Sequence, residues 1–398
     1  MDEFSTDIDP LALLFFEVDA LNDPAPAYRT LREECPVART KGLMGGSAVW
    51  LSRHEDVVWA LKHPEIFSSE AEAINIGQQH DLIPLQVDPP LHTKYRRFLA
   101  EWFSPRAIEH LEAGLRRHAV ALIDALVPAG ACDYHAAFAT PFPSTAFLEL
   151  MGLPMADLPM FLRWRDDIIR PPEDGEDPAA IRDRTGREIT EYFEAAIDAC
   201  RGGGPQGLLH DLVHAEFDGR PLHREELLGL AFLLIIAGLD TVTATLDCLM
   251  EYLANHPTQR RVLVDDPTRL PDAIDEMMRV LSPVPIVPRV MKADVVRDGV
   301  QLRADDHATI VLGAANLDPA AFDRPDVVDF DRPRAVNLAF GGGPHLCLGI
   351  NLARLELRIA LEEWHRRIPD YAIADDAAIV HSPGIRQANH LPLVFLAS

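Results

Sequence analysis

The sequence predicts a mainly α protein with small β sheets, built as one large domain over residues 1–398. Apolar residues recur at helical spacing in several long segments, whereas strand-like runs are short and gather in few places. Helices do not alternate regularly with strands, which disfavours a doubly wound parallel sheet. A chain of 398 residues with 48% hydrophobic residues can also bury ~75% of its unfolded surface.

The first half of the chain reads mostly as helices. The run AVWLS at 48–52 is strand-like, and a helical segment over 57–63 follows it. Helical apolar spacing then covers residues 95–103, 108–126, 145–151 and 189–199. The glycine-rich run RGGGP at 201–205 predicts a break before the next helix.

The most apolar stretch, LLGLAFLLIIAGL at 227–239, lies within one predicted long helix over 223–255. Glu225 and Glu226 sit in its first turn, where they suit the helix dipole. His256 followed by Pro257 ends it. The apolar stretch has thirteen residues without a charge, short of the ~18 expected of a membrane span. It therefore predicts a buried helix.

The last third mixes both kinds of element. A helix over 271–281 begins with proline, and short β-like runs follow over 286–312 with a turn at Asp298-Gly299. Residues 314–334 are rich in Asp, Pro and Asn and predict irregular structure. A helix over 350–368 and strand-like pieces over 371–395 complete the chain.

Charge and cysteine usage exclude several classes of function. The chain carries 37 basic and 62 acidic residues, a formal charge of −25, which argues against nonspecific binding to nucleic acid or anionic lipid. Its five cysteines form no CxxC pair, so neither a disulfide framework nor a zinc ribbon is expected. The acidic start MDEFSTDIDP shows no secretory signal. We expect a cytoplasmic protein without a membrane or nucleic-acid partner.

The chemistry centres on the run FGGGPHLCLG at 340–349. Its glycines permit a tight bend, and backbone N–H groups near a thiolate lower its pKa and tune any metal that it binds. A single thiolate on a stiff loop suits axial ligation of haem iron, whereas zinc needs four ligands. A structural cysteine beside a phosphate-binding glycine loop is the alternative. Five positions nevertheless match one pattern, which chance gives in roughly one chain in ten thousand: Phe340, Gly343, His345, Cys347 and Gly349.

With this loop, the sequence resembles the cytochrome P-450 haem-thiolate monooxygenases over nearly the whole chain. The runs VDFDRPRAVNLAFGGGPHLCLG and EEWHRRIPDYAIA look closest to the bacterial camphor-hydroxylating subgroup. The resemblance implies the cytochrome P-450 fold with a buried haem b. It makes Cys347 the axial iron ligand and places Phe340, Gly341 and Gly349 beside the haem.

The run Ala237-Gly238-Leu239-Asp240-Thr241 lies in the long predicted helix. Thr241 can bond back to a carbonyl one turn earlier and bend the helix, and an acid beside a hydroxyl can relay protons. Alone, these features indicate only a kinked buried helix. The resemblance implies the family's oxygen-activation motif, with Asp240 and Thr241 catalytic, Ala237 and Gly238 against the haem, and Arg170 holding Asp240 between turnovers.

Four cationic side chains are implied as partners of the two haem propionates, since buried carboxylates need such partners: His92, Arg96, Arg289 and His345. The camphor subgroup has an acidic residue shortly before the counterpart of Arg289. This sequence has Ile286-Val287-Pro288 there, so the surroundings of the propionates must differ.

Glu276 and Arg279 lie three residues apart, on one helix face. Such pairs are usually surface salt bridges of little value. The resemblance implies a buried structural pair joined by Arg332, with Arg334 as the alternative third member.

The resemblance also implies which segments contact substrate. Their side chains are mostly apolar, as in most small-molecule sites, and comprise His80, Leu82, Leu85, Leu233, Ile236, Ala237, Val287 and Ile385. Camphor hydroxylases have a ketone-binding tyrosine near position 80. His80 can donate a hydrogen bond too, but with different reach, so a larger terpenoid or norisoprenoid is expected in place of camphor. A solvent-facing His80 in a mobile loop is the alternative.

The expected reaction inserts one oxygen atom from O2 into a C–H bond of a small apolar substrate. The resemblance implies electrons from a 2Fe-2S ferredoxin with its NAD(P)H-dependent reductase. Lys94, Arg96, Arg97 and Arg354 could form its basic docking patch, or simply a solvated helix face. A haem-thiolate peroxygenase is one alternative, although that class lacks the acid–alcohol pair. A non-catalytic haem-based sensor or carrier of hydrophobic ligands is the other.

Overall fold

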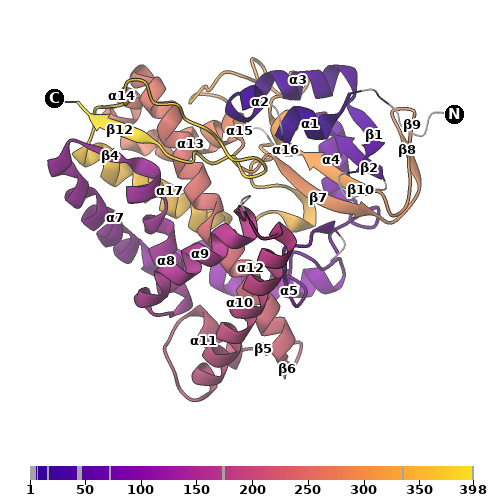
Figure 1. Cartoon of the computed structure of the whole chain (residues 1–398), viewed down its shortest axis with the longest axis horizontal. Coiled ribbons are helices and arrows are strands. Elements are labelled where there is room, and N and C mark those ends of the chain that lie inside the picture. The colour runs from indigo at the N-terminus through magenta and orange to yellow at the C-terminus, as the bar shows by residue number, and fades with distance from the viewer. Residues whose placement is uncertain are drawn as a thin grey trace.

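The computed structural model describes residues 6, 8–15, 18–42, 47–70, 73–172, 175–333 and 336–396. Helices make up most of it, and Figure 1 shows the main sheet to one side, beside the N-terminal helices. The expected mainly α fold with small sheets is confirmed.

The helices run as follows: α1 (Pro10–Phe15), α2 (Val18–Asn22), α3 (Ala25–Glu34), α4 (His54–Lys62), α5 (Leu91–Phe103), α6 (Pro105–Ile108), α7 (Glu112–Leu126), α8 (Pro141–Met151), α9 (Leu158–Ile169), α10 (Pro178–Arg201), α11 (Leu208–His214), α12 (Arg224–Leu239), α13 (Thr241–Asn255), α14 (Pro257–Asp265), α15 (Leu270–Leu281), α16 (Leu312–Asn316) and α17 (Ile350–Arg367). A π-helical turn, η4 (His135–Ala139), precedes α8, and a 3-10 turn, η7 (Gly343–His345), lies in the cysteine loop.

The main sheet has the strand order β1 (Val37–Lys41), β2 (Ser47–Leu51), β10 (His307–Val311), β7 (Ile286–Met291) and β3 (Phe67–Ser68). A second sheet has the order β11 (Tyr371–Ile373), β12 (Pro392–Phe395) and β4 (Ala131–Asp133). Two short hairpins join β5 (Glu216–Phe217) to β6 (Arg220–Pro221) and β8 (Val295–Arg297) to β9 (Val300–Leu302).

The register of the main sheet follows from one parallel and several antiparallel pairs. Ile310 of β10 lies opposite Leu51 of the parallel β2 and opposite Val287 of the antiparallel β7. The β8–β9 turn falls at Asp298-Gly299, as expected, with φ of 50° and 78°. Positive φ at both central residues matches the twist of a tight hairpin.

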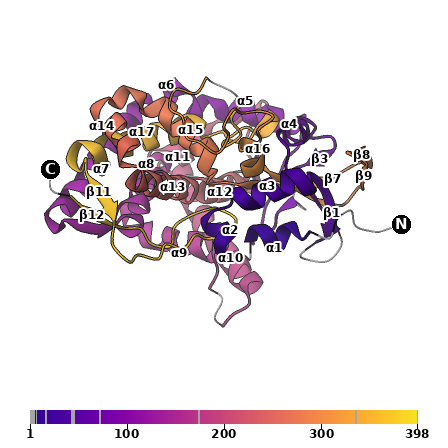
Figure 2. The same cartoon turned by 90° about the horizontal axis from the view of Figure 1, so that it is seen from above.

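The predicted helix over 223–255 is interrupted once, because Asp240 separates α12 from α13. Both helices cross the middle of the molecule in Figure 2. The span Arg224–Asn255 is long and apolar enough to cross a membrane, with a mean hydropathy of 2.1, but 67% of its most apolar window is buried inside the protein. It is therefore a central core element, as its composition predicts.

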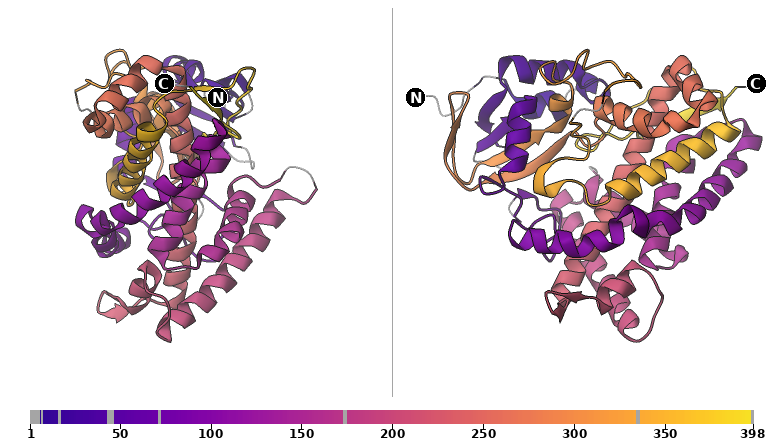
Figure 3. Two further views of the ribbon diagram at one scale, coloured as in Figure 1. Left: turned by 90° about the vertical axis from the view of Figure 1, so that its left-hand side faces the viewer. Right: turned by 180° about the vertical axis from the view of Figure 1, so that it is seen from behind.

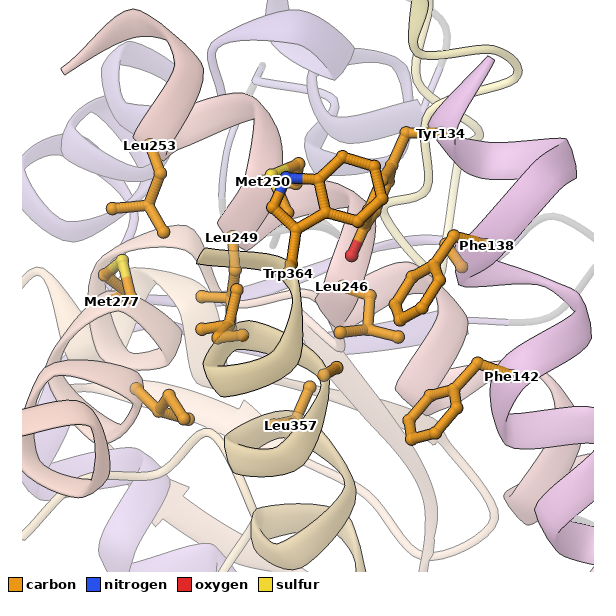
Figure 4. Close-up of a cluster of buried hydrophobic side chains, with 14 of the residues drawn as sticks. Tyr134, Phe138, Phe142, Leu246, Leu249, Met250, Leu253, Met277, Leu357 and Trp364 are labelled. Atoms are coloured by element: carbon orange, nitrogen blue, oxygen red, sulfur yellow. The ribbon is translucent and has the colours of Figure 1, made fainter. Parts of the chain in front are cut away.

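A large apolar cluster fixes α13 against α17 and the η4–α8 segment (Figure 4). The Trp364 ring of α17 lies 4.8 Å from the Tyr134 ring and 5.4 Å from the Phe138 ring, both edge to face. Each buried aromatic removes 150–250 Å² from water, so such pairs dominate packing. On its other side, α17 runs alongside α7 (Figure 3). These contacts hold the helix that follows the cysteine loop.

Candidate active site

The cysteine loop is a tight turn set against α4. The Cys347 N–H donates to the Phe340 carbonyl at 2.9 Å, and Gly341 and Gly343 have φ of 73° and 63°. A Cβ at Gly343 would lie 1.9 Å from the Leu61 carbonyl oxygen. Only glycine allows both that φ and that approach, so α4 and the loop hold Cys347 at one place.

The surroundings of Cys347 favour the thiolate in part. Burial raises the pKa of its thiol above the usual range, while the Gly349 backbone N–H and the charges of Arg96 and Arg354 lower it. The Arg354 guanidinium also lies 5.2 Å from the centre of the Phe340 ring. The side chain keeps part of its surface accessible, so Cys347 can act as a ligand.

The other four cysteines have a different character. All are free, and burial raises the pKa of each thiol, to about 11 for Cys35 and to about 12 for Cys132 and Cys248. The fourth is Cys200, which is buried. In the described ranges, no group of three His, Cys, Asp or Glu could hold a metal ion. The predicted use of a single thiolate fits this arrangement.

Buried basic side chains lie close together beside the cysteine loop. The rings of His92 and His345 lie 4.0 Å apart, and His92 is 2% exposed. Both ring nitrogens of His92 and Nε2 of His345 are buried without a hydrogen-bond partner in the described structure. Arg289 is 7% exposed, and its Nη1 donates at 2.6 Å to the carbonyl of the adjacent Pro288. The described residues therefore offer the ring nitrogens no hydrogen-bond partner, and Arg289 Nη1 only a neutral carbonyl.

The pKa values of these side chains reflect the same shortage of negative charge. Burial, followed by the neighbouring positive charges, lowers the pKa of His92 to about 4 and that of His345 to about 2. Burial lowers the pKa of Arg289 to about 10. One acid, Asp88, lies 4.0 Å from His345. A doubly anionic group placed here would partner these donors, and the two propionates of haem meet that need.

One face of α12 is open although the helix lies in the core. Its accessible positions recur at helical spacing, and the rest of the helix centre is buried. We call this set the open face. Its last member is the first residue of α13 and the others belong to α12: Leu233, Leu234, Ile236, Ala237, Gly238 and Thr241. Leu348, next to Cys347, packs against the same apolar cluster as Leu233 and Ile236, so α12 and the cysteine loop both border that cluster.

The acid–alcohol pair stands where the central helix bends. The Thr241 hydroxyl donates to the Ala237 carbonyl at 2.8 Å, the local bond expected to bend the helix. Asp240 is fully buried; its Oδ1 accepts from Arg170 Nη2 at 2.8 Å and its Oδ2 has no partner in the part described. Arg170 also donates to Ser382 at 3.2 Å, a contact that sequence reasoning missed.

The expected contact between Arg332 and the Glu276–Arg279 pair is present. Glu276 accepts from Arg279 Nη2 and from Arg332 Nε, both at 2.8 Å. These cations hold the pKa of Glu276 below its usual range against the effect of burial. Arg334, the alternative partner, lies outside the described residues.

The predicted substrate residues divide into two groups. His80, Val287 and Ile385 are half-buried, and Leu85 is 37% exposed. Leu82 is 1% exposed and packs in the apolar core, and its N–H donates to the Gln86 side chain at 2.9 Å. Contact of Leu82 with substrate stays a sequence-based prediction.

The expected basic patch is largely neutralised. Lys94 pairs with Asp218 at 2.7 Å, and Arg354 pairs with Asp275 at 2.7 Å. Arg96 is half-buried next to Cys347. Arg97 remains as an exposed cation. Asp218 and Asp275 are distant in sequence from their partners, so no local pattern reveals these pairs.

Comparisons with known proteins agree with this geometry. The family model described as "Cytochrome P450" matches residues 268–364. The steroid C26-monooxygenase of Mycolicibacterium smegmatis is 32% identical, with 94% of this chain and 92% of that protein covered. The cytochrome P450 monooxygenase PikC of Streptomyces venezuelae is 34% identical, with 94% and 92% covered.

A solved structure extends the likeness to the whole fold. The Bacillus subtilis cytochrome P450 PksS superposes with a TM-score of 0.89 at 28% identity, covering 98% of this chain and 100% of that chain. Members of this family bind haem b through a cysteine thiolate, the group that the cysteine loop and the buried cations fit. The chain belongs to the cytochrome P450 family of monooxygenases.

Proposed function

We propose that the protein is a ferredoxin-dependent haem-thiolate monooxygenase that hydroxylates a small apolar terpenoid or norisoprenoid. The observation that most directly supports haem binding is the position of Arg96. Its charge acts on the Cys347 thiol and on both His92 and His345. The Cys347 thiol and the unpartnered basic side chains therefore belong to one site.

The chain's residues hold the group as follows. Cys347 would supply the thiolate that binds the haem iron, with Phe340, Gly341 and Gly349 beside it. The propionates would take His92, Arg96, Arg289 and His345 as partners. The small Ala237 leaves room along the open face, and Gly238, the other residue expected against the haem, lets the helix pack close to Phe147, since a Cβ there would lie 2.9 Å from the Phe147 ring. When bound, haem b supplies the activation of O2 for insertion into a C–H bond, and an electron-donating thiolate favours O–O cleavage.

The protein manages protons and position around that chemistry. The Asp240 carboxylate can accept a proton at its unpartnered Oδ2 while Arg170 holds Oδ1. The Thr241 hydroxyl lies on the open face with its proton donated to the Ala237 carbonyl, and it can donate into the site by rotating away from that carbonyl. Apolar side chains of that face exclude water and hold one C–H bond of the substrate in place, which is catalysis by positioning.

The substrate assignment draws on the side chains of the site. Leu233, Ile236, Val287 and Ile385 offer apolar contact, and His80 offers a hydrogen-bond donor among them. The relatives named above include a steroid monooxygenase, and steroids are also bulky hydrocarbons. A bulky terpenoid with one carbonyl suits this set, and likeness to the camphor-hydroxylating subgroup remains a sequence-based prediction.

The remaining parts of the proposal concern context. We place residues 1–398 in one domain and the protein in the cytoplasm. Electrons come from a 2Fe-2S ferredoxin and its NAD(P)H-dependent reductase, which must approach a chain of net charge −25. Arg97 is an exposed cation on α5, whereas Lys94 on the same helix is paired with Asp218. Ferredoxin contact at Arg97 would offset part of the repulsion.

The decisive experiment tests the ligand and the reaction together. The reduced carbon monoxide complex of the wild type is expected to show the red-shifted band of thiolate ligation, and Cys347→Ser to lose it. Cys248→Ser is the matched control, because Cys248 is buried and its Sγ lies 3.2 Å from the Arg386 carbonyl oxygen. A band that survives unchanged in Cys347→Ser rules out Cys347 as the ligand.

Consumption of reduced nicotinamide then separates the classes. A monooxygenase consumes it with a ferredoxin system in proportion to product. A peroxygenase forms product from peroxide alone, and a sensor or carrier binds ligand without turnover. Either of the last two results overturns the proposed function.

A separate comparison tests the substrate class. His80→Phe is expected to weaken binding of a ketone about fivefold relative to the matching hydrocarbon, since one hydrogen bond is worth ~1 kcal/mol net. Binding is measured as the spectral shift of the ferric protein. An equal change for both ligands removes the carbonyl contact from the proposal.

A further inference from the structure

A second buried acid lies on the central helix, outside the site described above. Asp247 of α13 is fully buried. Its sequence neighbours Leu246, Leu249 and Met250 belong to the apolar cluster shown in Figure 4. Its Oδ2 lies 2.7 Å from His135 Nδ1, and its Oδ1 has no partner in the described structure. A half-satisfied carboxylate in an apolar core is costly, so packing alone does not explain it.

Asp247 shares a helix face with Asp240. Seven residues separate them, which is two turns and ~10 Å along the axis. Thr243 lies between them near the same face, fully buried, with its hydroxyl 3.0 Å from the Leu239 carbonyl oxygen. Both carboxylates present one unpartnered oxygen. The Asp240 charge also acts on Asp247, raising its pKa.

His135 connects this acid to the outside. It opens the π-helical turn η4, and its side chain is 17% exposed. Its Nε2 lies 3.4 Å from the Thr140 hydroxyl. Single π-helical turns are frequent at functional sites, and here the turn places one imidazole between solvent and a buried carboxylate.

We propose that His135 and Asp247 form a proton-supply branch that recharges Asp240 from solvent by way of the Thr243 hydroxyl and water. This inference rests on the proposed function only for its last step, the use of the proton at Asp240. His135 and Asp247 are positioning residues, since they act through Asp240.

Each transfer balances. A solvent proton binds Nε2 of His135 as the Nδ1 proton passes to Oδ2 of Asp247. Rotation of the neutral carboxyl turns its proton toward Thr243, and Thr243 and water carry a proton to Oδ2 of Asp240. Asp247 is left as a carboxylate that accepts the next proton, and the His135 ring resets by proton exchange with solvent. No oxidant or reductant takes part.

The charges around Asp247 suit this task. Burial raises its pKa to about 6, with Asp133 of β4 and Asp240 adding to the rise and His135 opposing it. Tyr134 and Cys248 also face it, and burial keeps both protonated by raising the pKa of each. A carboxyl near neutrality can both accept and release a proton at working pH.

The test compares Asp247→Asn, His135→Phe and Thr243→Val with a matched control. Glu251→Gln serves as the control, because Glu251 stands four residues further along α13 and pairs with His381 at 2.7 Å. It has the same chemistry but lies beyond Asp247 from Asp240. Asn at 247 keeps the volume and one acceptor, so folding is expected to survive.

Turnover is the first readout. Asp247→Asn and His135→Phe are expected to slow product formation about tenfold, less than the ~100-fold or more of a direct acid–base group. Because Asp247 must be protonated to donate, the wild-type rate falls as the pH rises through about 6, and this alkaline limb disappears in Asp247→Asn. Glu251→Gln stays within about twofold of wild type. Unchanged rates and profile in Asp247→Asn, or an equal loss in Glu251→Gln, overturn the proposal.

The second readout needs no turnover. Infrared spectra of the ferric protein are expected to show a carboxylic acid band that titrates near pH 6, is absent in Asp247→Asn and persists in Glu251→Gln. Its exchange in heavy water slows in His135→Phe. Unaltered exchange in that variant overturns the branch even if the wild type makes product. If exchange of the carboxylic acid proton slows in His135→Phe but the wild type makes no product, the proton-supply branch is supported and the proposed function is wrong.

Discussion

Thr241, the first residue of α13, directly follows the buried Asp240 and places a hydroxyl on the open face. Replacement by Ala removes the donor to the Ala237 carbonyl but leaves the cysteine loop and the cation cluster intact. Haem and substrate binding are expected to persist, while product per electron pair falls about tenfold and peroxide rises, because a proton donor to reduced oxygen is lost. Product and peroxide are measured against nicotinamide consumed.

Thr245→Ala is the control, since the Thr245 hydroxyl makes the same kind of bond one turn later, to the Thr241 carbonyl at 2.7 Å. Thr245 is 4% exposed. Full coupling in Thr241→Ala, or equal uncoupling in the control, contradicts a proton role for this hydroxyl.

Glu356 predicts a pH dependence of stability. It is 4% exposed on α17, and burial raises its pKa to about 8, against ~4.3 in the unfolded chain. The folded protein holds a proton that the unfolded chain releases between these values. The stabilisation is thus full below pH ~4.3 and is lost as the pH rises through about 8.

Wild type is therefore expected to lose ~1 kcal/mol per pH unit relative to Glu356→Gln over that window. Urea unfolding of the two proteins at pH 5 and pH 8 measures the difference. Glu362→Gln, on the same helix and paired with Arg116 and Arg358, should retain the wild-type slope. Parallel curves for wild type and Glu356→Gln would show that Glu356 is ionised in the fold.

At the scale of elements, the segment before α5 is clamped against α10. A Cβ on Gly186 of α10 would lie 1.9 Å from the Gly77 carbonyl oxygen, so Gly186→Ala must displace the loop. A cost of ~1–3 kcal/mol is expected from overpacking, with faster hydrogen exchange over residues 74–82 and faster ligand entry.

Gly114→Ala in α7 is the control, because its Cβ would meet only the flexible end of Glu149 at 3.3 Å. That variant should be neutral or gain up to ~1 kcal/mol from helix propensity. Exchange that is unchanged in Gly186→Ala would mean that the loop yields without opening.

The elements also show what sequence can predict. The cysteine loop and the bend at Thr241 depend on residues that are close together in the sequence, so local sequence patterns were enough to predict both. Arg170 and Asp240 are 70 residues apart, and only the family resemblance joined them. The burial of Leu82 could not be predicted, because a loop pattern does not say which side chains face inward. Asp247 and His135, 112 residues apart, meet only through packing of η4 on α13.

For the whole molecule, Arg279 ties the helical side to the segment that leads into the cysteine loop. Its Nη1 donates to the carbonyls of Asn316 and Pro325 at 2.7 and 2.6 Å, and the guanidinium lies 4.7 Å from the centre of the Phe322 ring. Arg279→Met leaves the Glu276 carboxylate short of a partner in the interior. A loss of ~3–5 kcal/mol and weaker haem retention are expected.

Arg261→Met is the matched control. Arg261 makes a two-point pair with Asp370 at 2.7 and 2.8 Å, but its side chain is 48% exposed. Surface pairs contribute ~1 kcal/mol or less. Thermal unfolding and haem content of both variants decide whether Arg279 has this role, and equal losses would remove it.

The four thiols other than Cys347 are wholly or partly buried, and they are expected to react slowly with common labels. Maleimides need a thiolate, and Cys35, Cys132, Cys200 and Cys248 stay protonated at neutral pH. Dyes could therefore be attached at cysteines introduced at the exposed positions Asp81 and Glu191 without first stripping the native ones. Single-molecule energy transfer between them would follow the opening of the 74–82 segment against α10 in an otherwise unaltered protein.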